Sequence, residues 1–456
     1  MQPEMFYTTN SDGSIPLILL TKNQYELGIE TFTQQENNHF KLAQFSGKPG
    51  EVCLITTNDG QLSKAYLGTG EGNQMLALAV AATRLPAASF LPQQNVSHTA
   101  KVIWSLAQYR FSVYKKQTLS HRVLVVNEEG FDEIIAESKA VYLVRDLINT
   151  PTNNLGPAEL SSVLENLAHE FGADFKEWVG DELLSAHFEA IHTVGRASAK
   201  APRLLYLNWG SPKDPRLCLI GKGVCFDSGG LDIKPCDGMR LMKKDMGGAA
   251  HVIGLAQSIM SQNLPVNLLV YIPAVENSIG PDSYRPGDVI TMYNGLTVEV
   301  ANTDAEGRLI LADAIAKACE EKPDLLIDFS TLTGAARVAV GTEIAAMFSN
   351  DDRLAQELSE SALAINDPIW RLPLFAGYES MIESPIADLS NLAPSPYAGA
   401  ITAALFLQHF VTKNLPWVHF DIMAWNLGNK PGRPEGGEAM GLRALMHYLG
   451  KVYKKY

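Results

Sequence analysis

The chain has 456 residues, more than one hydrophobic core usually supports, so we expect two domains. Apolar residues make up 46% of it and charged residues 19%, a composition typical of globular proteins that excludes disordered, collagenous and coiled-coil classes. The formal net charge of −13 does not favour binding to phosphate backbones or anionic lipids. We therefore expect neither a nucleic-acid partner nor a membrane partner.

The cysteines indicate a reducing compartment. They are odd in number, form no CxxC pair and fit free thiols better than a disulfide framework: Cys53, Cys218, Cys225, Cys236 and Cys319. No uncharged apolar run approaches the roughly 20 residues of a membrane span, and the first residues lack the basic and apolar segments of a secretory signal. We expect a cytoplasmic protein.

The first part of the chain is predicted to form a small α/β domain. Short β-like runs occur at 16–20, 52–56, 102–106 and 123–126, and an Ala-rich helix is expected at 73–84. A helix over 133–149 leads into TPTNNLGP, where two prolines end any helix. We place the domain change there, with an N-terminal domain at 1–140 and a catalytic domain at 141–456.

The second part alternates strands and helices. Buried strands are expected at 217–225, 266–275, 325–329 and 417–420, and helices at 247–260, 309–321 and 401–411. This order predicts an α/β domain with a central mixed sheet flanked by helices. Its functional site is expected beyond the carboxyl ends of the strands.

Several common catalytic motifs are absent. The sequence contains no HExxH, no GxSxG and no GxxxxGK[ST], so the usual zinc protease, α/β-hydrolase and P-loop hypotheses lose their support. The GTGEG segment at 68–72 does not fit GxGxxG and is interpreted as a turn.

Acidic residues instead concentrate in two segments, 221–250 and 302–309. Asp227 follows a predicted strand, and Asp245 precedes a predicted helix, where an N-cap role is the simpler interpretation. Asp304 and Glu306 are two residues apart, so an extended segment would place both carboxylates on one face together with Arg308. The four carboxylates form either a solvated acidic patch or a shared site.

A shared dry site would require cations, because neighbouring carboxylates repel one another. Two divalent ions roughly 3.5–4 Å apart would meet this need and would activate a water for hydrolysis. Lys222 lies between two glycines in an apolar strand, where loss of its proton would let it ligate a metal. The alternative is that Lys222 reaches solvent or pairs with Asp227. Lys234 could stay protonated and polarise a carbonyl oxygen.

The segments GKGVCFDSGG, DIKP, KKDMGGAA and NTDAEGRLILADA together resemble the leucyl aminopeptidase family of cytosolic dimetal exopeptidases. The resemblance covers roughly residues 145–456, and we match no motif in the first 130 or so. It implies that Lys222, Asp227, Asp245 and Glu306 hold one metal. Asp227, Asp304 and Glu306 would hold a second, more exchangeable one. The implied ions are manganese, zinc or magnesium, and oxygen-dominated ligation chooses weakly among them.

The resemblance also implies a reaction. A hydroxide bridging the two metals would attack the first peptide bond of short peptides with a free N-terminus. Lys234 would stabilise the oxyanion, and Arg308 would hold a bicarbonate that serves as general base. Met242, Thr331 and Gly334 would line the pocket for the first side chain, where leucine and other aliphatic residues are expected. Core filling is the simpler role for Met242.

The implied assembly is a homohexamer. Two segments depart from the family pattern: HFDIMAWN lacks the small-residue run of HLDIAGTAW, and NLAPSPYAGAITAA is less glycine-rich than usual. Both lie where the family shapes its pocket, so the side-chain preference is less firmly implied than the metal chemistry. Two other classes stay open. A relative without turnover could bind DNA, and a dimetal phosphatase would share the carboxylates but would leave the metal-ligand lysine without a role.

Overall fold

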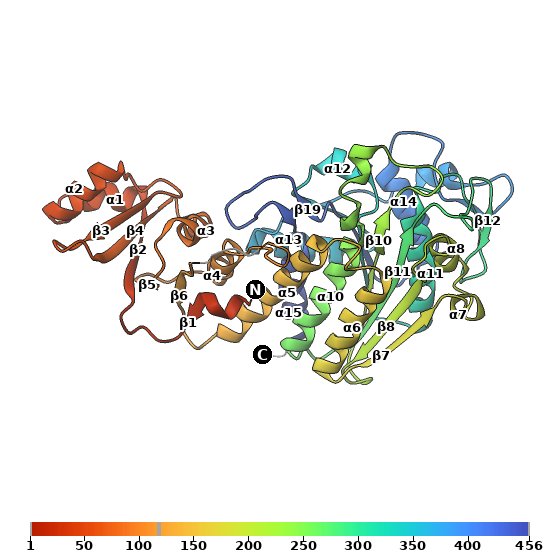
Figure 1. Cartoon of the computed structure of the whole chain (residues 1–456), viewed down its shortest axis with the longest axis horizontal. Coiled ribbons are helices and arrows are strands. Elements are labelled where there is room, and N and C mark those ends of the chain that lie inside the picture. The colour runs from red at the N-terminus through yellow and green to blue at the C-terminus, as the bar shows by residue number, and fades with distance from the viewer. Residues whose placement is uncertain (1, 116–119, 455–456) are drawn as a thin grey trace. The chain divides into compact units, whose positions relative to one another are not determined.

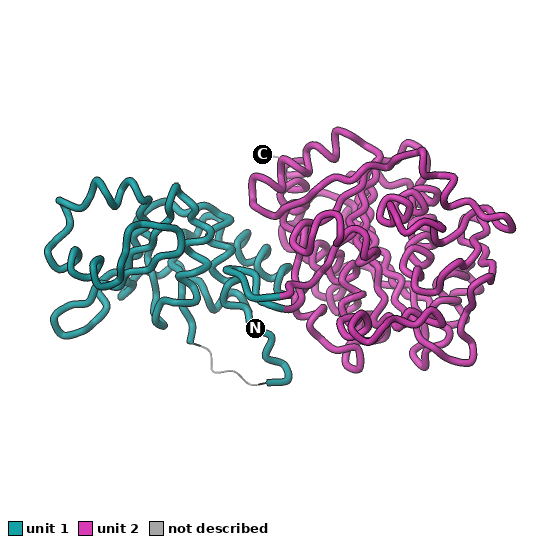
Figure 2. Tube along the Cα trace, turned by 90° about the horizontal axis from the view of Figure 1, so that it is seen from above, with its two compact units in different colours: residues 1–142, 428–435 teal, residues 143–427, 436–456 magenta. Residues whose placement is uncertain are grey.

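The computed structural model describes residues 2–115 and 120–454. The chain divides into two compact units (Figure 2), the first comprising 1–142 and 428–435 and the second 143–427 and 436–456. The segment 428–435 thus belongs to the first unit although it follows most of the second in sequence.

The first unit is built on a six-stranded sheet with the order β1-β6-β5-β2-β4-β3 (Figure 1). Only the β3–β4 pair is antiparallel among the strand pairs described. Its elements are η1 (Pro3–Phe6), β1 (Tyr7–Thr8), β2 (Ile15–Thr21), α1 (Lys22–Gly28), α2 (Gln34–Ala43), β3 (Val52–Thr56), β4 (Leu62–Gly70), α3 (Gln74–Arg84), β5 (Ser89–Pro92), α4 (His98–Leu106) and β6 (Val123–Val125).

One expected strand is a helix. Residues 102–106 lie in α4 (His98–Leu106), whose Ser97 cap accepts a hydrogen bond from the Ala100 N–H. The run VIWSL is apolar enough for either element, and a run this short does not distinguish them by periodicity. The cap at Ser97 was the missed signal for a helix start.

The boundary between the first and the second unit lies within α5 (Phe131–Asn149), so this helix begins in the first unit and ends in the second. Up to the end of α10 the second unit contains α6 (Pro157–Phe171), β7 (Asp174–Val179), α7 (Glu182–Ser185), α8 (Glu189–Gly195), β8 (Arg203–Trp209), β9 (Arg216–Gly221), β10 (Gly223–Asp227), α9 (Cys236–Met239), η2 (Met242–Met246) and α10 (Gly247–Ser261). There follow β11 (Asn267–Asn277), β12 (Val289–Thr291), β13 (Thr297–Glu299), α11 (Glu306–Glu320), β14 (Leu325–Ser330), α12 (Gly334–Val340), β15 (Ala345–Ser349), α13 (Asp352–Ile365), β16 (Ile369–Arg371), η3 (Ala376–Ile382), β17 (Leu389–Ser390), α14 (Gly399–Gln408), β18 (Trp417–Asp421), β19 (Trp425–Asn426), β20 (Gly436–Gly437) and α15 (Leu442–Tyr453).

A nine-stranded sheet forms the centre of this unit. Its order is β16-β15-β18-β14-β9-β11-β8-β7, with β10 also paired to β11. The strands from β18 to β11 are parallel, whereas β15, β8 and β7 introduce antiparallel pairs. This confirms the predicted α/β fold, with a smaller N-terminal domain and a larger domain around a mixed sheet.

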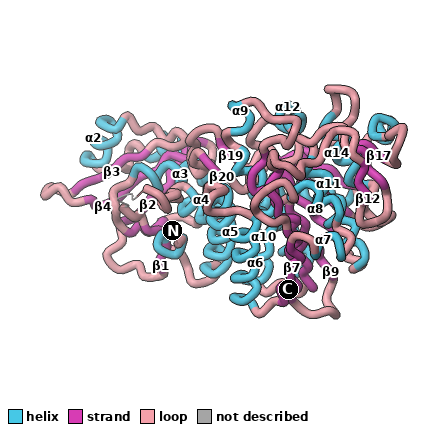
Figure 3. Tube along the Cα trace, turned by 45° about the vertical axis from the view of Figure 1, so that its right-hand side comes forward, coloured by secondary structure: helices cyan, strands magenta, loops and turns pink. Residues whose placement is uncertain are grey.

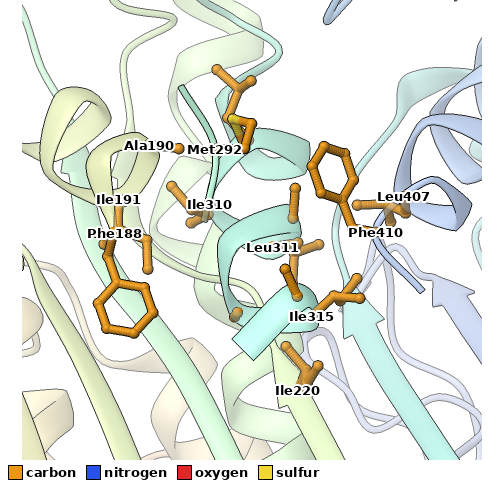
Figure 4. Packing of buried hydrophobic residues seen from close by; sticks show 14 of the residues in the cluster. Phe188, Ala190, Ile191, Ile220, Met292, Ile310, Leu311, Ile315, Leu407 and Phe410 are labelled. Carbon is orange, nitrogen blue, oxygen red and sulfur yellow. The ribbon is translucent and has the colours of Figure 1, made fainter. Parts of the chain in front are cut away.

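Helices cover both faces of this sheet. Successive strand residues point to opposite faces, and in β9 Gly221 lies against the backbone of α10 whereas Ile220 joins the cluster that contains α11. α6 and α10 stand side by side on one face (Figure 3). On the other face, α8 and α11 pack on the sheet in a buried apolar cluster (Figure 4) that includes Phe188, Ile191, Ile310, Leu311 and Ile315. This core fixes the position of α11, whose first turn reaches the site.

The predicted strand 217–225 is interrupted at Lys222. β9 ends at Gly221 and pairs with β14 and β11, whereas β10 begins at Gly223 and pairs with β11. At the break, the Lys222 N–H donates to the Phe329 carbonyl and the Lys222 carbonyl accepts from the Ala249 N–H. The backbone of Lys222 is therefore fixed where β9, β14 and α10 meet.

In the part of the chain that the structure describes, no helix is long and apolar enough to cross a bilayer.

Candidate functional site

A cavity of about 270 Å³ in the second unit gathers the predicted site residues. Asp227 ends β10, Asp245 lies in η2, and Asp304 precedes α11, which begins at Glu306. The cavity is lined by all ten predicted residues: Lys222, Asp227, Lys234, Met242, Asp245, Asp304, Glu306, Arg308, Thr331 and Gly334.

Three carboxylates form its centre. One oxygen from each of Asp227, Asp245 and Glu306 lies within 4.8 Å of the others, and all three residues are buried. Asp304 is at the rim, with its side chain 33% exposed. The Asp227 carboxylate is held by the Gly229 N–H at 2.9 Å and the Asn277 amide at 2.8 Å. Gly229 has φ +89°, which few side chains tolerate, so glycine permits the turn that places its N–H on Asp227.

Two expectations about local structure were wrong. Asp245 does not cap α10, because it lies one residue earlier than the Met246 cap and its carboxylate instead accepts from the Thr331 hydroxyl at 2.7 Å. Asp304 and Glu306 do not share an extended segment, since Glu306 and Arg308 already belong to α11. Residues two apart in a helix point to different sides. The side chains of Glu306 and Arg308 therefore reach the cavity from different directions.

Lys222 neither reaches solvent nor pairs with Asp227. It is 2% exposed, and its Nζ lies 2.7 Å from Asp245 Oδ2 and 2.9 Å from Glu306 Oε1. Burial by itself lowers the pKa of Lys222, but the facing carboxylates outweigh burial, so this pKa lies above its usual range. A Cβ at Gly307 would lie 2.5 Å from Lys222 Cε, so the glycine of NTDAEGRL makes room for the lysine. A neutral Lys222 that ligates metal stays a prediction.

Lys234 pairs with the other side of the cluster. Its Nζ lies 2.8 Å from Asp227 Oδ2 and 2.5 Å from Asp304 Oδ1. Burial alone lowers the pKa of Lys234, but Asp227 and Glu306 outweigh burial, so the pKa is raised and the lysine stays protonated. Its side chain is 16% exposed, which leaves it accessible from the cavity.

The carboxylates have more negative charge than the two lysines neutralise. Burial, and then the charge of Asp227, raise the pKa of Glu306 to about 8 and that of Asp304 to about 6. Burial also opposes ionisation of Asp245, but Lys222 and Lys244 outweigh it and hold the pKa of Asp245 below its usual value. Glu306 Oε2 is buried without a hydrogen-bond partner among the described residues. An oxygen-rich, electron-donating cluster with an unused oxygen fits divalent cations.

Arg308 presents unused donors to the same cavity. It is 5% exposed, and within the described residues its Nε and one terminal nitrogen have no hydrogen-bond partner. Burial lowers the pKa of Arg308 to about 10, against the effect of Glu306, so the guanidinium stays charged at neutral pH. A planar cation with free donors is suited to a small planar anion.

The structure adds two cations that the sequence reasoning missed. Lys244 and Arg337 line the cavity beside Met242, Thr331 and Gly334. Lys244 is 1% exposed, and burial, the largest influence, lowers its pKa to about 7. The only sequence signal was the pair Lys243–Lys244 before a buried helix. In a helix with three residues per turn, successive side chains point in different directions, so one lysine of the pair can turn inward while the other does not.

Comparison with known proteins places both units. The model of the cytosol aminopeptidase family catalytic domain matches residues 142–446, and the model of the M17 aminopeptidase N-terminal domain matches residues 15–127. The second match covers the region in which the sequence reasoning found no motif. The "Probable cytosol aminopeptidase" of Chlamydia trachomatis serovar D is 36% identical over 453 residues, covering 91% of each chain. That of Syntrophotalea carbinolica is 38% identical over 445 residues, covering 89% of each.

Two solved structures match the fold of almost the whole chain. The crystal structure of the cytosol aminopeptidase from Coxiella burnetii has a TM-score of 0.95 at 45% identity, covering 98% of this chain and 99% of that one. The bottromycin maturation enzyme BotP, in complex with Mn, has a TM-score of 0.87 at 31% identity, covering 96% and 99%.

Proposed function

The chain belongs to the cytosol aminopeptidase family of metal-dependent exopeptidases, as the resemblance implied, and on this premise we propose how its site works. The protein removes the N-terminal residue of short peptides whose α-amino group is free. The observation that carries this proposal is the buried triad of Asp227, Asp245 and Glu306, whose oxygens lie within 4.8 Å of one another between two lysines.

We assign the metal ligands by residue. Lys222, Asp227, Asp245 and Glu306 would hold one ion, and Asp227, Asp304 and Glu306 the other. When bound, two divalent cations supply Lewis acidity to the scissile carbonyl and an activated water. The oxygen donors admit manganese, zinc or magnesium. The solved complex of BotP with Mn is one observation in favour of manganese.

Lys234 is suited to stabilise the oxyanion that forms at the scissile carbonyl. It stays protonated because Asp227 and Asp304 face it at 2.8 Å and 2.5 Å, and 16% of its side chain is exposed toward the cavity. A charge already fixed in place needs no reorganisation when negative charge develops on the substrate.

Arg308 is suited to hold bicarbonate as the general base. Its two unused donors match a planar carboxylate-like anion, and burial keeps water from competing for them. No histidine lines the cavity among the residues that the structure describes, so no side chain is an evident base there. When bound, this anion would supply a general base for the reaction, and Arg308 would hold it.

The remaining expectations belong to the same proposal. The α-amino group would fix the register at the first bond, Met242, Thr331 and Gly334 would contact the first side chain, and aliphatic residues such as leucine would be accepted. A cytoplasmic location and a homohexamer are likewise implied by the resemblance and await measurement.

The test uses chelator-stripped protein reconstituted separately with Mn²⁺, Zn²⁺, Mg²⁺ or Co²⁺. We expect release of p-nitroaniline from a panel of aminoacyl p-nitroanilides, and none from their N-acetylated counterparts. Hydrolysis of the acetylated forms would refute the free amino-group requirement. Turnover of p-nitrophenyl phosphate but of no aminoacyl substrate would favour the phosphatase alternative, and a salt-dependent shift of duplex DNA without turnover would favour the binding-protein alternative.

A further inference from the structure

We propose that the cavity accepts an anionic first side chain, aspartate or glutamate, and that Lys244 and Arg337 bind its carboxylate. This inference rests on the proposed aminopeptidase function and deepens it, because it concerns which first residue the enzyme prefers. It also differs from the aliphatic preference that the resemblance alone implies.

Lys244 is the main observation. It lines the cavity from η2, it is 1% exposed, and its Nζ has no hydrogen-bond partner in the described part of the chain. A buried lysine without a partner carries its charge much less readily than one that faces a carboxylate. The arrangement is therefore one that a carboxylate entering the cavity would complete.

The acidic groups nearest to Lys244 are already engaged. The Asp245 carboxylate faces Lys222 at 2.7 Å and accepts from the Thr331 hydroxyl. Asp421 accepts from the N–H groups of Leu332 and Thr333, at 3.0 Å and 3.1 Å, and from the Thr333 hydroxyl at 2.6 Å. Neither makes a hydrogen bond with Lys244 in the described structure, so the ammonium keeps its donors for a ligand.

Arg337 adds a second positive charge to the lining of the cavity. It lines the cavity from α12, and a Cβ at Gly334 would lie 3.3 Å from its terminal nitrogen. Another terminal nitrogen lies 3.8 Å from the sulfur of Met423, which is a weak acceptor. A thioether does not neutralise a guanidinium, so the charge of Arg337 is also available to a ligand.

The position of these cations explains why they would contact the first side chain of the substrate. Met242 and Lys244 lie two residues apart in one short helix, and Gly334 and Arg337 lie three apart in another. All four residues line the cavity that also holds the carboxylate triad. A residue whose scissile carbonyl lies at the triad would place its side chain in the same cavity as Lys244 and Arg337, where a carboxylate could pair with them and an aliphatic side chain could not.

The experiment compares glutamyl with glutaminyl α-p-nitroanilide, which differ by the charge and keep nearly the same shape. With Mn²⁺-loaded wild type we expect kcat/KM to be at least tenfold higher for the glutamyl substrate, and also higher than for the leucyl one. Lys244→Met should lower the glutamyl value roughly ten- to a hundredfold, the usual range for one hydrogen bond to a charged group. The leucyl value of the same variant is measured beside it, so that a lost charge preference is distinguished from a general loss of activity.

Lys243→Met is the matched control. Lys243 is the preceding residue of η2, but its Nζ donates to the Asn149 carbonyl at 2.6 Å and lies 5.4 Å from the Trp425 ring centroid. Lys243 does not line the cavity. Its substitution removes the same charge from the same helix, so we expect the glutamyl-to-glutaminyl ratio to stay at the wild-type value.

The outcomes separate the two proposals. Wild type that cleaves leucyl substrate but shows no glutamyl preference, or Lys244→Met that keeps the preference, overturns this inference and leaves the aminopeptidase function intact. Metal-loaded wild type that cleaves no aminoacyl substrate overturns both. If Lys244→Met does not fold, Arg337→Met gives the same test from a half-buried position, and an unchanged glutamyl-to-glutaminyl ratio in it also overturns the inference.

Discussion

Replacing Lys222 by methionine tests the charge balance of the site. Methionine keeps much of the apolar stem and removes the ammonium that lies 2.7 Å from Asp245 and 2.9 Å from Glu306. All three residues are at most 2% exposed, so water cannot replace the lost charge. In the metal-free protein, two buried carboxylates then lose their shared counter-charge.

The magnitude follows from burial. Removing one partner of a buried, hydrogen-bonded ion pair typically lowers the free energy of unfolding by about 3–5 kcal/mol. Glu306, whose pKa burial raises to about 8, is already largely protonated at pH 7.5, so the lost ion pair is mainly that with Asp245 and we expect the lower end, about 3 kcal/mol. At roughly 2 °C per kcal/mol for a unit of this size, the melting temperature of the metal-free protein should fall by about 6 °C.

The assay is thermal unfolding at pH 7.5 with and without saturating Mn²⁺, with Lys243→Met as the control for loss of a lysine. If Lys222 also ligates metal, Mn²⁺ should raise the melting temperature of Lys222→Met less than that of wild type. A metal-free variant that unfolds at the wild-type temperature would refute the role of Lys222 as the shared counter-charge of Asp245 and Glu306. An equal rise with Mn²⁺ in both proteins would remove Lys222 from the ligand set.

Three further predictions concern other residues. Lys234→Met should lower kcat roughly 10²–10³-fold while metal content measured by atomic absorption stays at the wild-type level, and a loss of metal instead would contradict the oxyanion role. Arg308→Met should abolish any stimulation of kcat by added bicarbonate, and a stimulation like that of wild type would contradict bicarbonate binding. His251 is neutral when folded, because its Nδ1–H donates to the Gly247 carbonyl and its Nε2 accepts from the Met440 N–H, and burial lowers its pKa from 6.5 to about 4. As pH falls, the unfolded chain therefore binds a proton at His251 before the folded protein does. The contribution of neutral His251 to the free energy of unfolding is present above pH 6.5 and is lost as pH falls toward 4, by roughly 2 kcal/mol between pH 7 and pH 5. His251→Asn should reduce that loss in urea titrations, and an unchanged pH dependence of the free energy of unfolding would contradict it.

The sequence predicted the order of elements in the second unit well because its strands are buried and apolar. Asp227 was placed at a strand end by the apolar run before it and by the glycines after it, and the structure has it there. Lys222 was expected inside one strand, whereas the chain breaks there. Such a break depends on hydrogen bonds to Phe329 and Ala249, which are distant in sequence.

The parts that sequence could not predict depend on packing. The run 102–106 is almost wholly apolar, which suits a buried strand as well as a buried helix, and it forms a helix because its cap and its burial in the first unit decide between the two. Lys244 and Lys243 look alike in sequence. Only the packing of η2 turns one of them into the cavity and the other toward Asn149 and Trp425. The inclusion of 428–435 in the first unit has no local sequence signal.

The central claim is that the buried carboxylates gather divalent ions that make the protein an aminopeptidase. A single titration of Mn²⁺ into chelator-stripped protein, with bound metal and aminoacyl p-nitroanilide hydrolysis followed together, tests it most directly. We predict that two ions bind per chain and that hydrolysis rises with their occupancy, whereas Asp227→Ala binds fewer ions and stays inactive. A rate of hydrolysis in the stripped protein equal to that of the Mn²⁺-loaded protein would contradict this claim. So would metal binding that is the same in wild type and Asp227→Ala.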